Sequence, residues 1–225
     1  MLIAFEGIDG SGKTVQSFAL KSELESRGLD CSVFSFPVYE TRVGQLIFQH
    51  LYDQKYAFTL DPYIVSLLYA TNRMELRPGI LQALQSGQIV ICNRYTYSNV
   101  AFQGAKIDLQ NRSALIGWIE DLEFGIFKLP RPDIVVFLDL SPSKTVHFIK
   151  SKKEKTIQGP DQYEQNREFL QSVYNIYQEL QNSHDNWISI KCFSSAQVLS
   201  KERVSELVNE TIIPIIERKQ SKNKP

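Results

Sequence analysis

The sequence is poor in cysteine and has no net charge. Its three cysteines stand far apart without a CxxC pair, which argues against a disulfide framework or a zinc site and fits reduced thiols. The 25 basic and 25 acidic residues cancel. The chain therefore lacks the excess positive charge on which nonspecific nucleic-acid binding depends, and we expect no nucleic-acid partner.

Long hydrophobic runs are also missing. No apolar stretch approaches the roughly 20 residues needed to span a bilayer. Glu6 interrupts the first apolar run, so no signal-peptide pattern is visible. These absences predict a cytoplasmic protein without a membrane partner. With 225 residues, of which 43% are hydrophobic, the chain can build one substantial core.

Short apolar runs alternate with longer helical patterns. Because the runs are nearly continuous, they are typical of strands buried on both faces of a parallel sheet. We expect an α/β fold of three layers, with a five-stranded, mostly parallel sheet flanked by helices. The expected strands are Leu2–Phe5, Cys31–Phe36, Gln88–Cys92, Ile134–Leu140 and Trp187–Ile190.

The helical patterns fill the spaces between these strands. Pro78 and Gly79 favour a break or kink between two of the helices. Without an internal repeat or a linker, residues 1–225 read as one domain, with a polar tail expected to fray from about residue 219 to 225. The expected helices are Lys13–Arg27, Arg42–Tyr52, Pro62–Leu76, Pro78–Ser86, Gln110–Phe127, Pro142–Lys150, Tyr163–Ser183 and Ala196–Arg218.

A glycine-rich sequence follows the first strand and opens the first helix. It matches GxxxxGK[ST], the P-loop, whose backbone N–H groups and helix N-terminus bind phosphates. Lys13 supplies a charge for the transferring phosphates, and the Thr14 hydroxyl is a ligand for Mg²⁺. The fold is therefore expected to be of the P-loop NTPase type, with a nucleoside triphosphate as a ligand. The loop residues are Gly7, Ile8, Asp9, Gly10, Ser11, Gly12, Lys13 and Thr14.

Several segments together resemble the thymidylate kinase family. They agree with the family in order and spacing from residue 2 to about residue 180, and they are Phe5–Thr14, Phe36–Tyr39, Leu68–Arg73, Asn93–Lys106, Pro132–Asp139 and Asp161–Glu164. The resemblance implies transfer of a phosphoryl group from ATP to dTMP, giving dTDP and ADP, in dTTP biosynthesis. It also implies a homodimer, for which residues 62–76 are a candidate interface.

The resemblance and the spacing together suggest an acceptor pocket. Arg94 follows a strand at the carboxyl edge of the sheet, where a guanidinium can hold the acceptor phosphate. Tyr69 and Arg73 are four residues apart on an expected helix, so Tyr69 can stack on thymine while Arg73, which matches the family's base-reading arginine, contacts its edge. Asn99 and Gln103 have the same spacing and carry amides that can pair with thymine.

The resemblance alone assigns the remaining acceptor residues. It places Phe102 against the sugar, and Asp9 as the acceptor of a hydrogen bond from the 3′-hydroxyl. It puts Ser98 in the same site. The residues Phe36, Pro37 and Tyr39 correspond to the loop that walls the monophosphate, with Tyr39 as a candidate donor to it.

Residues 150–161 correspond to the family's lid, which closes over ATP and excludes water. In the family, a positive side chain from the P-loop or the lid reaches the transferring phosphate. This P-loop has Ser11 and no arginine, and the lid has lysines only, so we expect Lys150 or Lys153 to serve as a catalytic group without an arginine's fork. Asp161 and Tyr163 match the junction behind the lid, near the acceptor nucleotide.

Asn93 departs from the family, which usually has aspartate before this arginine. The family aspartate is thought to position Mg²⁺ through water. Asn93 offers an oxygen of similar reach without the charge, so we expect a metal role with slower turnover or help from Glu6 or Asp139. Two other readings stay open: a kinase for another pyrimidine nucleoside or monophosphate, and a weakened nucleotide-binding paralogue.

Overall fold

The protein is built around one parallel sheet. The computed structural model describes residues 1–52, 60–145, 161, 163, 166–195 and 197–222. In the sheet, five strands lie in the order β2-β3-β1-β4-β5, and each neighbouring pair is parallel. This confirms the predicted α/β fold. The strands are β1 (Leu2–Glu6), β2 (Cys31–Ser35), β3 (Ile89–Asn93), β4 (Ile134–Asp139) and β5 (Trp187–Lys191).

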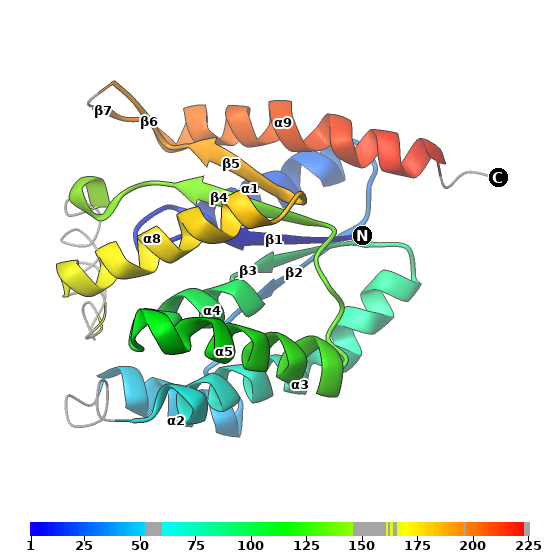
Figure 1. The fold of residues 1–225 in the computed structure, drawn as a ribbon. Coiled ribbons are helices and arrows are strands. Elements are labelled where there is room, and N and C mark those ends of the chain that lie inside the picture. The colour runs from blue at the N-terminus through cyan, green and yellow to red at the C-terminus, as the bar shows by residue number, and fades with distance from the viewer. Residues whose placement is uncertain (53–59, 146–160, 162, 164–165, 196, 223–225) are drawn as a thin grey trace.

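Helices cover both faces of the sheet (Figure 1). On one face lie α1 (Lys13–Ser26) and α9 (Lys201–Lys222), which contact each other and the sheet. The other face is covered by α3 (Pro62–Gln85), α4 (Thr96–Gly104), α5 (Leu109–Glu120) and α8 (Arg167–Ser183), and α2 (Arg42–Tyr52) packs outside α3. Among the described residues, no helix is long and apolar enough to cross a membrane.

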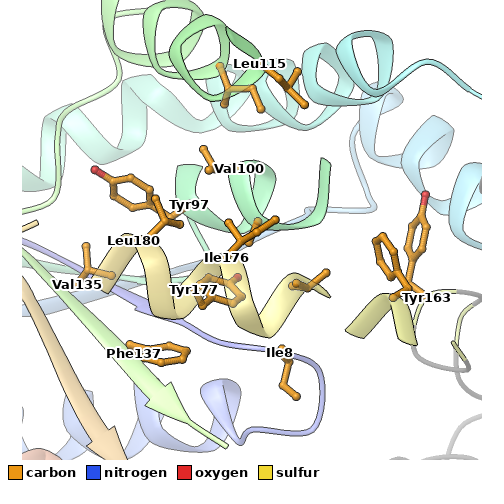
Figure 2. Close-up of a cluster of buried hydrophobic side chains, with 14 of the residues drawn as sticks. Ile8, Tyr97, Val100, Leu115, Val135, Phe137, Tyr163, Ile176, Tyr177 and Leu180 are labelled. Atoms are coloured by element: carbon orange, nitrogen blue, oxygen red, sulfur yellow. The ribbon is translucent and has the colours of Figure 1, made fainter. Parts of the chain in front are cut away.

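Alternating residues of each strand enter different cores. Ile134, Val136 and Leu138 of β4 pack under α1 and α9, whereas Val135 and Phe137 pack under α4 and α8. Figure 2 shows Phe137 lying beside Tyr177 of α8, and their ring centroids are 5.5 Å apart in a stacked arrangement. Burial on both faces explains why these strands lack polar alternation in the sequence.

The largest difference from expectation is in α3. The sequence predicted a break or kink at Pro78. A break is absent, because α3 is one helix from Pro62 to Gln85 with Pro78 inside it. Packing explains why the helix continues. Ile80 is fully buried after the proline, and a Cβ on Gly79 would lie 3.4 Å from the Phe34 ring. Buried contacts on both sides of Pro78 offset the cost of its missing N–H.

Other boundaries also differ. The expected helix over residues 110–127 divides into α5 and a π-helix, η1 (Asp121–Ile126). A short hairpin of β6 (Phe193–Ser194) and β7 (Gln197–Val198) precedes α9. In α9 the helix continues to Lys222, beyond residue 219, where fraying was expected. Lys219 Nζ lies 3.2 Å from Asp133 Oδ1, an ion pair that anchors this last part of the helix.

All the strands of the sheet point the same way, so their carboxyl ends form one edge (Figure 1). Glu6, Asn93 and Asp139 are the last residues of β1, β3 and β4. Ligands of open α/β folds bind outside this edge. The loops that follow β1 and β3 therefore lie where a ligand of such a fold would bind.

Candidate functional site

The loop after β1 has the shape of a phosphate cradle. Gly10 and Gly12 have positive φ angles of 79° and 93°, a conformation that other residues adopt only at a cost. A Cβ on Gly7 would lie 2.9 Å from Ser11 Oγ and 3.0 Å from the Leu138 carbonyl oxygen, so a side chain would displace the loop. Gly12 precedes α1 without a capping side chain, which leaves its first N–H groups for an anion.

Lys13 lies against this loop. Its Nζ donates to the Ile8 carbonyl oxygen at 2.8 Å, and only 6% of the residue is exposed. Ile8 itself is part of the hydrophobic core, and Figure 2 shows its side chain inside the bend of the loop. The Ile8 side chain is therefore turned away from the phosphate cradle, whereas Gly10, Gly12 and Lys13 line a cavity beside the loop.

Arg94 occupies the turn between β3 and α4. Its φ angle is 66°, a left-handed conformation that is rare outside glycine, and its backbone N–H donates to the Phe5 carbonyl oxygen at 3.0 Å. The guanidinium forms an ion pair with Asp9 and donates to Ser98 Oγ at 3.0 Å. Burial lowers the pKa of Arg94, but Asp9, Tyr177 and Glu6 together outweigh it and raise the pKa overall. Arg94 thus remains a cation beside the P-loop.

Glu6 holds the beginning of α4 against β1. Its carboxylate accepts hydrogen bonds from the N–H groups of Tyr95 and Ser98 at 2.9 and 3.0 Å, from Ser98 Oγ at 2.5 Å and from the Tyr177 hydroxyl at 3.0 Å. Burial raises the pKa of Glu6, and these donors oppose the rise. Its side chain is occupied in joining β1, α4 and α8.

The metal role expected for Glu6 or Asp139 finds no geometric support. Neither residue lines the cavity. Asp139 accepts hydrogen bonds from the Tyr174 hydroxyl at 2.6 Å and from Gln178 Nε2 at 3.2 Å. Both carboxylates are engaged with neighbouring helices, so neither stands ready to replace the missing aspartate at position 93.

Asn93 faces the P-loop from the end of β3. Its Nδ2 donates to Thr14 Oγ1 at 3.1 Å and to Ser35 Oγ at 3.4 Å. Its Oδ1 is buried and, within the described part of the chain, has no hydrogen-bond partner. Asn93 Oδ1 and the Thr14 hydroxyl are oxygen ligands of the kind that Mg²⁺ takes alongside phosphates and water. Within the described ranges, no group of three acidic, histidine or cysteine residues is placed to hold a metal.

One cavity of about 620 Å³ joins the P-loop to the predicted acceptor residues. Every residue that the resemblance or the spacing assigned to the acceptor contributes to its lining. The cavity also includes Val15, Ser35, Leu51 and Tyr52, which the sequence did not single out. The predicted residues in the lining are Asp9, Gly10, Gly12, Lys13, Thr14, Phe36, Pro37, Tyr39, Tyr69, Arg73, Asn93, Arg94, Ser98, Asn99, Phe102, Gln103, Asp161 and Tyr163.

Aromatic rings form much of the acceptor wall. The Arg94 guanidinium lies 5.2 Å from the centroid of the Phe102 ring. Burial raises the pKa values of Tyr39 and Tyr69 above their ordinary range. Both phenols therefore stay protonated at neutral pH and remain hydrogen-bond donors. A flat apolar wall with a few polar groups suits a nucleobase and its sugar.

Arg73 is less available than the sequence suggested. Only 2% of it is exposed, and its Nε and Nη2 donate to both carboxylate oxygens of Glu123 at 2.7 and 2.5 Å. Burial lowers the pKa of Arg73, but Glu123 raises it overall. Glu123 lies in η1 and was missed, because within an expected helix its carboxylate gave no signal of a buried partner. Arg73 still lines the cavity.

Tyr163 connects the cavity to two basic side chains. Its hydroxyl accepts from Lys106 Nζ at 2.6 Å and contacts His50 Nε2 at 2.7 Å. Its backbone N–H donates to Asp161 Oδ1 at 2.9 Å. These contacts fasten the chain behind the expected lid to α2 and to the end of α4. Lys150 and Lys153 fall outside the described residues.

Lys106 gives stability a pH dependence that can be measured. Burial lowers its pKa from 10.5 to about 7. Between these pH values the unfolded chain binds a proton that the folded protein lacks, so stability rises with pH. We expect the free energy of unfolding, measured by urea titration from pH 7 to 9, to rise more steeply in the wild type than in Lys106→Met, by at most about 1.4 kcal/mol per pH unit. Partial exposure makes the difference smaller.

The control for this experiment is Lys21→Met, at a lysine on α1 whose side chain is 30% exposed. It should keep the wild-type dependence on pH. Parallel stability curves for the wild type and Lys106→Met would show that Lys106 keeps its proton throughout this range in the folded protein.

Comparisons with known proteins identify the family of the chain. A family model described as thymidylate kinase matches residues 5–202. A thymidylate kinase of Arabidopsis thaliana is 33% identical over 202 residues, which cover 89% of this chain and 68% of that protein. One of Danio rerio is 30% identical over 217 residues, covering 96% and 92%. The solved thymidylate kinase of Candida albicans superposes with a TM-score of 0.73 at 26% identity, covering 97% of this chain and 92% of that one.

Proposed function

The chain belongs to the thymidylate kinase family, and we propose that it transfers the γ-phosphoryl group of ATP to dTMP in the cavity beside the P-loop. The observation that carries the proposal is that this one cavity is lined both by the P-loop and by the acceptor residues assigned from the sequence. A nucleoside monophosphate kinase needs that arrangement, because an acceptor phosphate must meet the γ-phosphate of the donor in line.

The donor side consists of the P-loop and the start of α1. Backbone N–H groups from Gly10 to Thr14 hold the β- and γ-phosphates, and Lys13 Nζ turns from the Ile8 carbonyl oxygen to the phosphates. An oxygen of the acceptor phosphate forms a bond to the γ-phosphorus while the bond to the bridging oxygen of ADP breaks. The negative charge that develops on the transferring phosphoryl group is stabilised by the P-loop N–H groups and by Lys13.

The acceptor side is organised by Arg94. Its guanidinium forks onto the dTMP phosphate, and Asp9, its partner in the structure, accepts from the 3′-hydroxyl of the sugar. Phe102 lies against the sugar, and Tyr69 stacks on the base. Arg73, Asn99 and Gln103 read the edge of the base. Because Arg94 is already held by Asp9 and Ser98, little ordering remains for binding to complete.

The oxygen atoms beside the P-loop suit Mg²⁺. Thr14 Oγ1 and Asn93 Oδ1, which has no hydrogen-bond partner among the described residues, would hold the metal, and it would neutralise charge on the phosphates. With one neutral amide in place of a carboxylate, these residues hold the metal more weakly. We further propose that Lys150 or Lys153, outside the described residues, meets the transferring phosphate. The protein acts in the cytoplasm as a homodimer in this proposal.

An assay of ADP release tests the function directly. Purified protein with ATP and Mg²⁺ should release ADP when dTMP is present and only background ADP with thymidine, because thymidine brings no phosphate for Arg94. Removing Mg²⁺ with a chelator should reduce the dTMP rate to background. A higher rate with thymidine than with dTMP would instead assign a nucleoside kinase, and tight nucleotide binding without dTDP formation would assign a binding protein.

A further inference from the structure

Glu123 lies behind the acceptor wall at the centre of a buried polar cluster. Its side chain is completely buried in η1, a π-helix, and such irregular turns often occur at functional sites. Besides the two hydrogen bonds from Arg73, its carboxylate accepts one from Thr96 Oγ1 at 2.7 Å and one from Asn99 Nδ2 at 3.0 Å. One carboxylate thus contacts Arg73 and Asn99, two of the cavity residues that the sequence assigned to the edge of the base.

The first consequence concerns Arg73. Its fork to Glu123 uses Nε and Nη2. Nη1 makes no hydrogen bond to any described residue, and Arg73 lines the cavity. A guanidinium has donors only, so the group that Arg73 offers to a ligand is a donor. Glu123 thus determines that Nε and Nη2 bind within the protein and that Nη1 is the donor left for a ligand.

The second consequence concerns Asn99. Its Nδ2 has two acceptors, Glu123 Oε1 and the Ser66 carbonyl oxygen, each at 3.0 Å. Its Oδ1 is buried without a hydrogen-bond partner in the described part of the chain. Two acceptors on one side settle the direction of the amide, because rotating it by half a turn would bring Oδ1 against two oxygens. The amide of Asn99 is therefore held in one orientation, in which Oδ1 can accept a hydrogen bond from a ligand.

From this geometry we infer that Glu123 is a positioning residue that selects a pyrimidine with an N3–H group, namely thymine or uracil, and rejects cytosine. The inference rests on the proposed function of the cavity. Thymine and uracil present the O4 acceptor beside the N3–H donor, which matches the Arg73 donor beside the Asn99 acceptor. Cytosine presents an amino donor at C4 and an acceptor at N3, so both pairings would be repulsive.

The negative charge of Glu123 strengthens the rejection of cytosine. Asn99 could accept cytosine only by turning its Nδ2 toward the ligand, and Glu123, as an anion that donates nothing, opposes that rotation. Arg73 cannot become an acceptor at all. In Glu123→Gln, by contrast, the new amide can donate to Asn99 Oδ1, so the rotated state becomes available. The neutral side chain should therefore relax the choice of base while keeping nearly the same shape.

The test is the ratio of kcat/KM between acceptors. We expect the wild type to prefer dTMP and dUMP over dCMP by at least about 100-fold, because a mismatched base leaves buried polar groups unpaired. In Glu123→Gln, the preference for dTMP and dUMP over dCMP should shrink by at least about tenfold. The kcat/KM values for dTMP and dUMP should fall by a factor equal for the two. If Glu123 had a purely structural role, its replacement would lower kcat/KM for all three acceptors by the same factor and leave the ratios unchanged.

The control is Glu120→Gln, three positions earlier, whose side chain is 25% exposed and lies 4.0 Å from His184 Nε2. Its acceptor ratios should equal those of the wild type. If Glu123→Gln fails to fold, Asn99→Ala keeps the pair of Glu123 and Arg73 and removes the free acceptor. Asn99→Ala should lower kcat/KM for dTMP and dUMP by at least about tenfold, and kcat/KM for dCMP by a smaller factor.

Unchanged ratios in Glu123→Gln, or equal losses for all acceptors in Asn99→Ala, would overturn the inference while the wild type still used dTMP. A wild-type protein that releases ADP with none of the acceptors would instead refute the proposed function, so the two failures can be told apart.

Discussion

Replacing Arg94 with alanine is expected to lower kcat/KM for dTMP by about 1000-fold, the lower end of what a charge-stabilising arginine contributes in phosphoryl transfer. Arg94 is the cation that stands between the P-loop and the acceptor wall, held by Asp9 and Ser98. Without it, the acceptor phosphate loses both its anchor and its alignment with the donor. Initial rates of ADP release at varied dTMP measure the effect.

Two further variants sharpen this result. Arg94→Lys keeps the charge and loses the fork, so it should recover only part of the activity. Arg203→Ala removes an arginine on α9 whose side chain is 49% exposed and should leave the rate unchanged. If Arg94→Ala retained activity within about tenfold of the wild type, Arg94 would not be the ligand of the acceptor phosphate.

Replacing Lys13 with methionine should have a comparable effect on turnover. We expect kcat to fall by about 1000-fold at saturating ATP and dTMP, as when a preorganised charge is removed from a transition state. The Lys13 aliphatic stem is buried against the loop, and methionine can fill that space, so the fold should persist. Single-turnover measurements with excess enzyme separate this loss from a change in ATP binding.

Lys21→Met is the matched control, since Lys21 lies farther along α1 and pairs with Glu25 on the surface. It should turn over like the wild type. Thermal shift with dTMP alone should be the same for Lys13→Met and the wild type, because the acceptor wall is intact. A kcat for Lys13→Met close to that of Lys21→Met would contradict a role for Lys13 in the transfer step.

The elements with strong periodic patterns could be predicted closely. The P-loop was defined by motif and context, and α2 begins at Arg42 and ends at Tyr52 as expected. The strands shifted by one residue at most at either end, because continuous apolar runs mark burial but not the last ladder hydrogen bond. A resemblance to a known family then assigned cavity residues from distant segments, which no local pattern can bring together.

What could not be predicted depends on tertiary contacts. The passage of α3 through Pro78 is stabilised by packing of the residues around it, which a local rule for proline cannot include. Glu123 is the clearest case at the site. A glutamate within an amphipathic pattern reads as solvated, and only the π-helical turn and the approach of Arg73 show that it is completely buried. The engagement of Glu6 with Tyr177 and of Asp139 with Tyr174 depends likewise on helices that are distant in the sequence.

The attachment of α4 to β1 has a further consequence. The Arg94 N–H donates to the carbonyl oxygen of Phe5, the Glu6 carboxylate takes the next N–H groups of the turn, and the phosphate loop begins one residue later at Gly7. The start of α4 is thus tied to the residues just before the phosphate loop by one main-chain hydrogen bond and by the Glu6 carboxylate. A change at Glu6 would therefore loosen the attachment of Arg94 to the P-loop without removing a group that contacts either nucleotide.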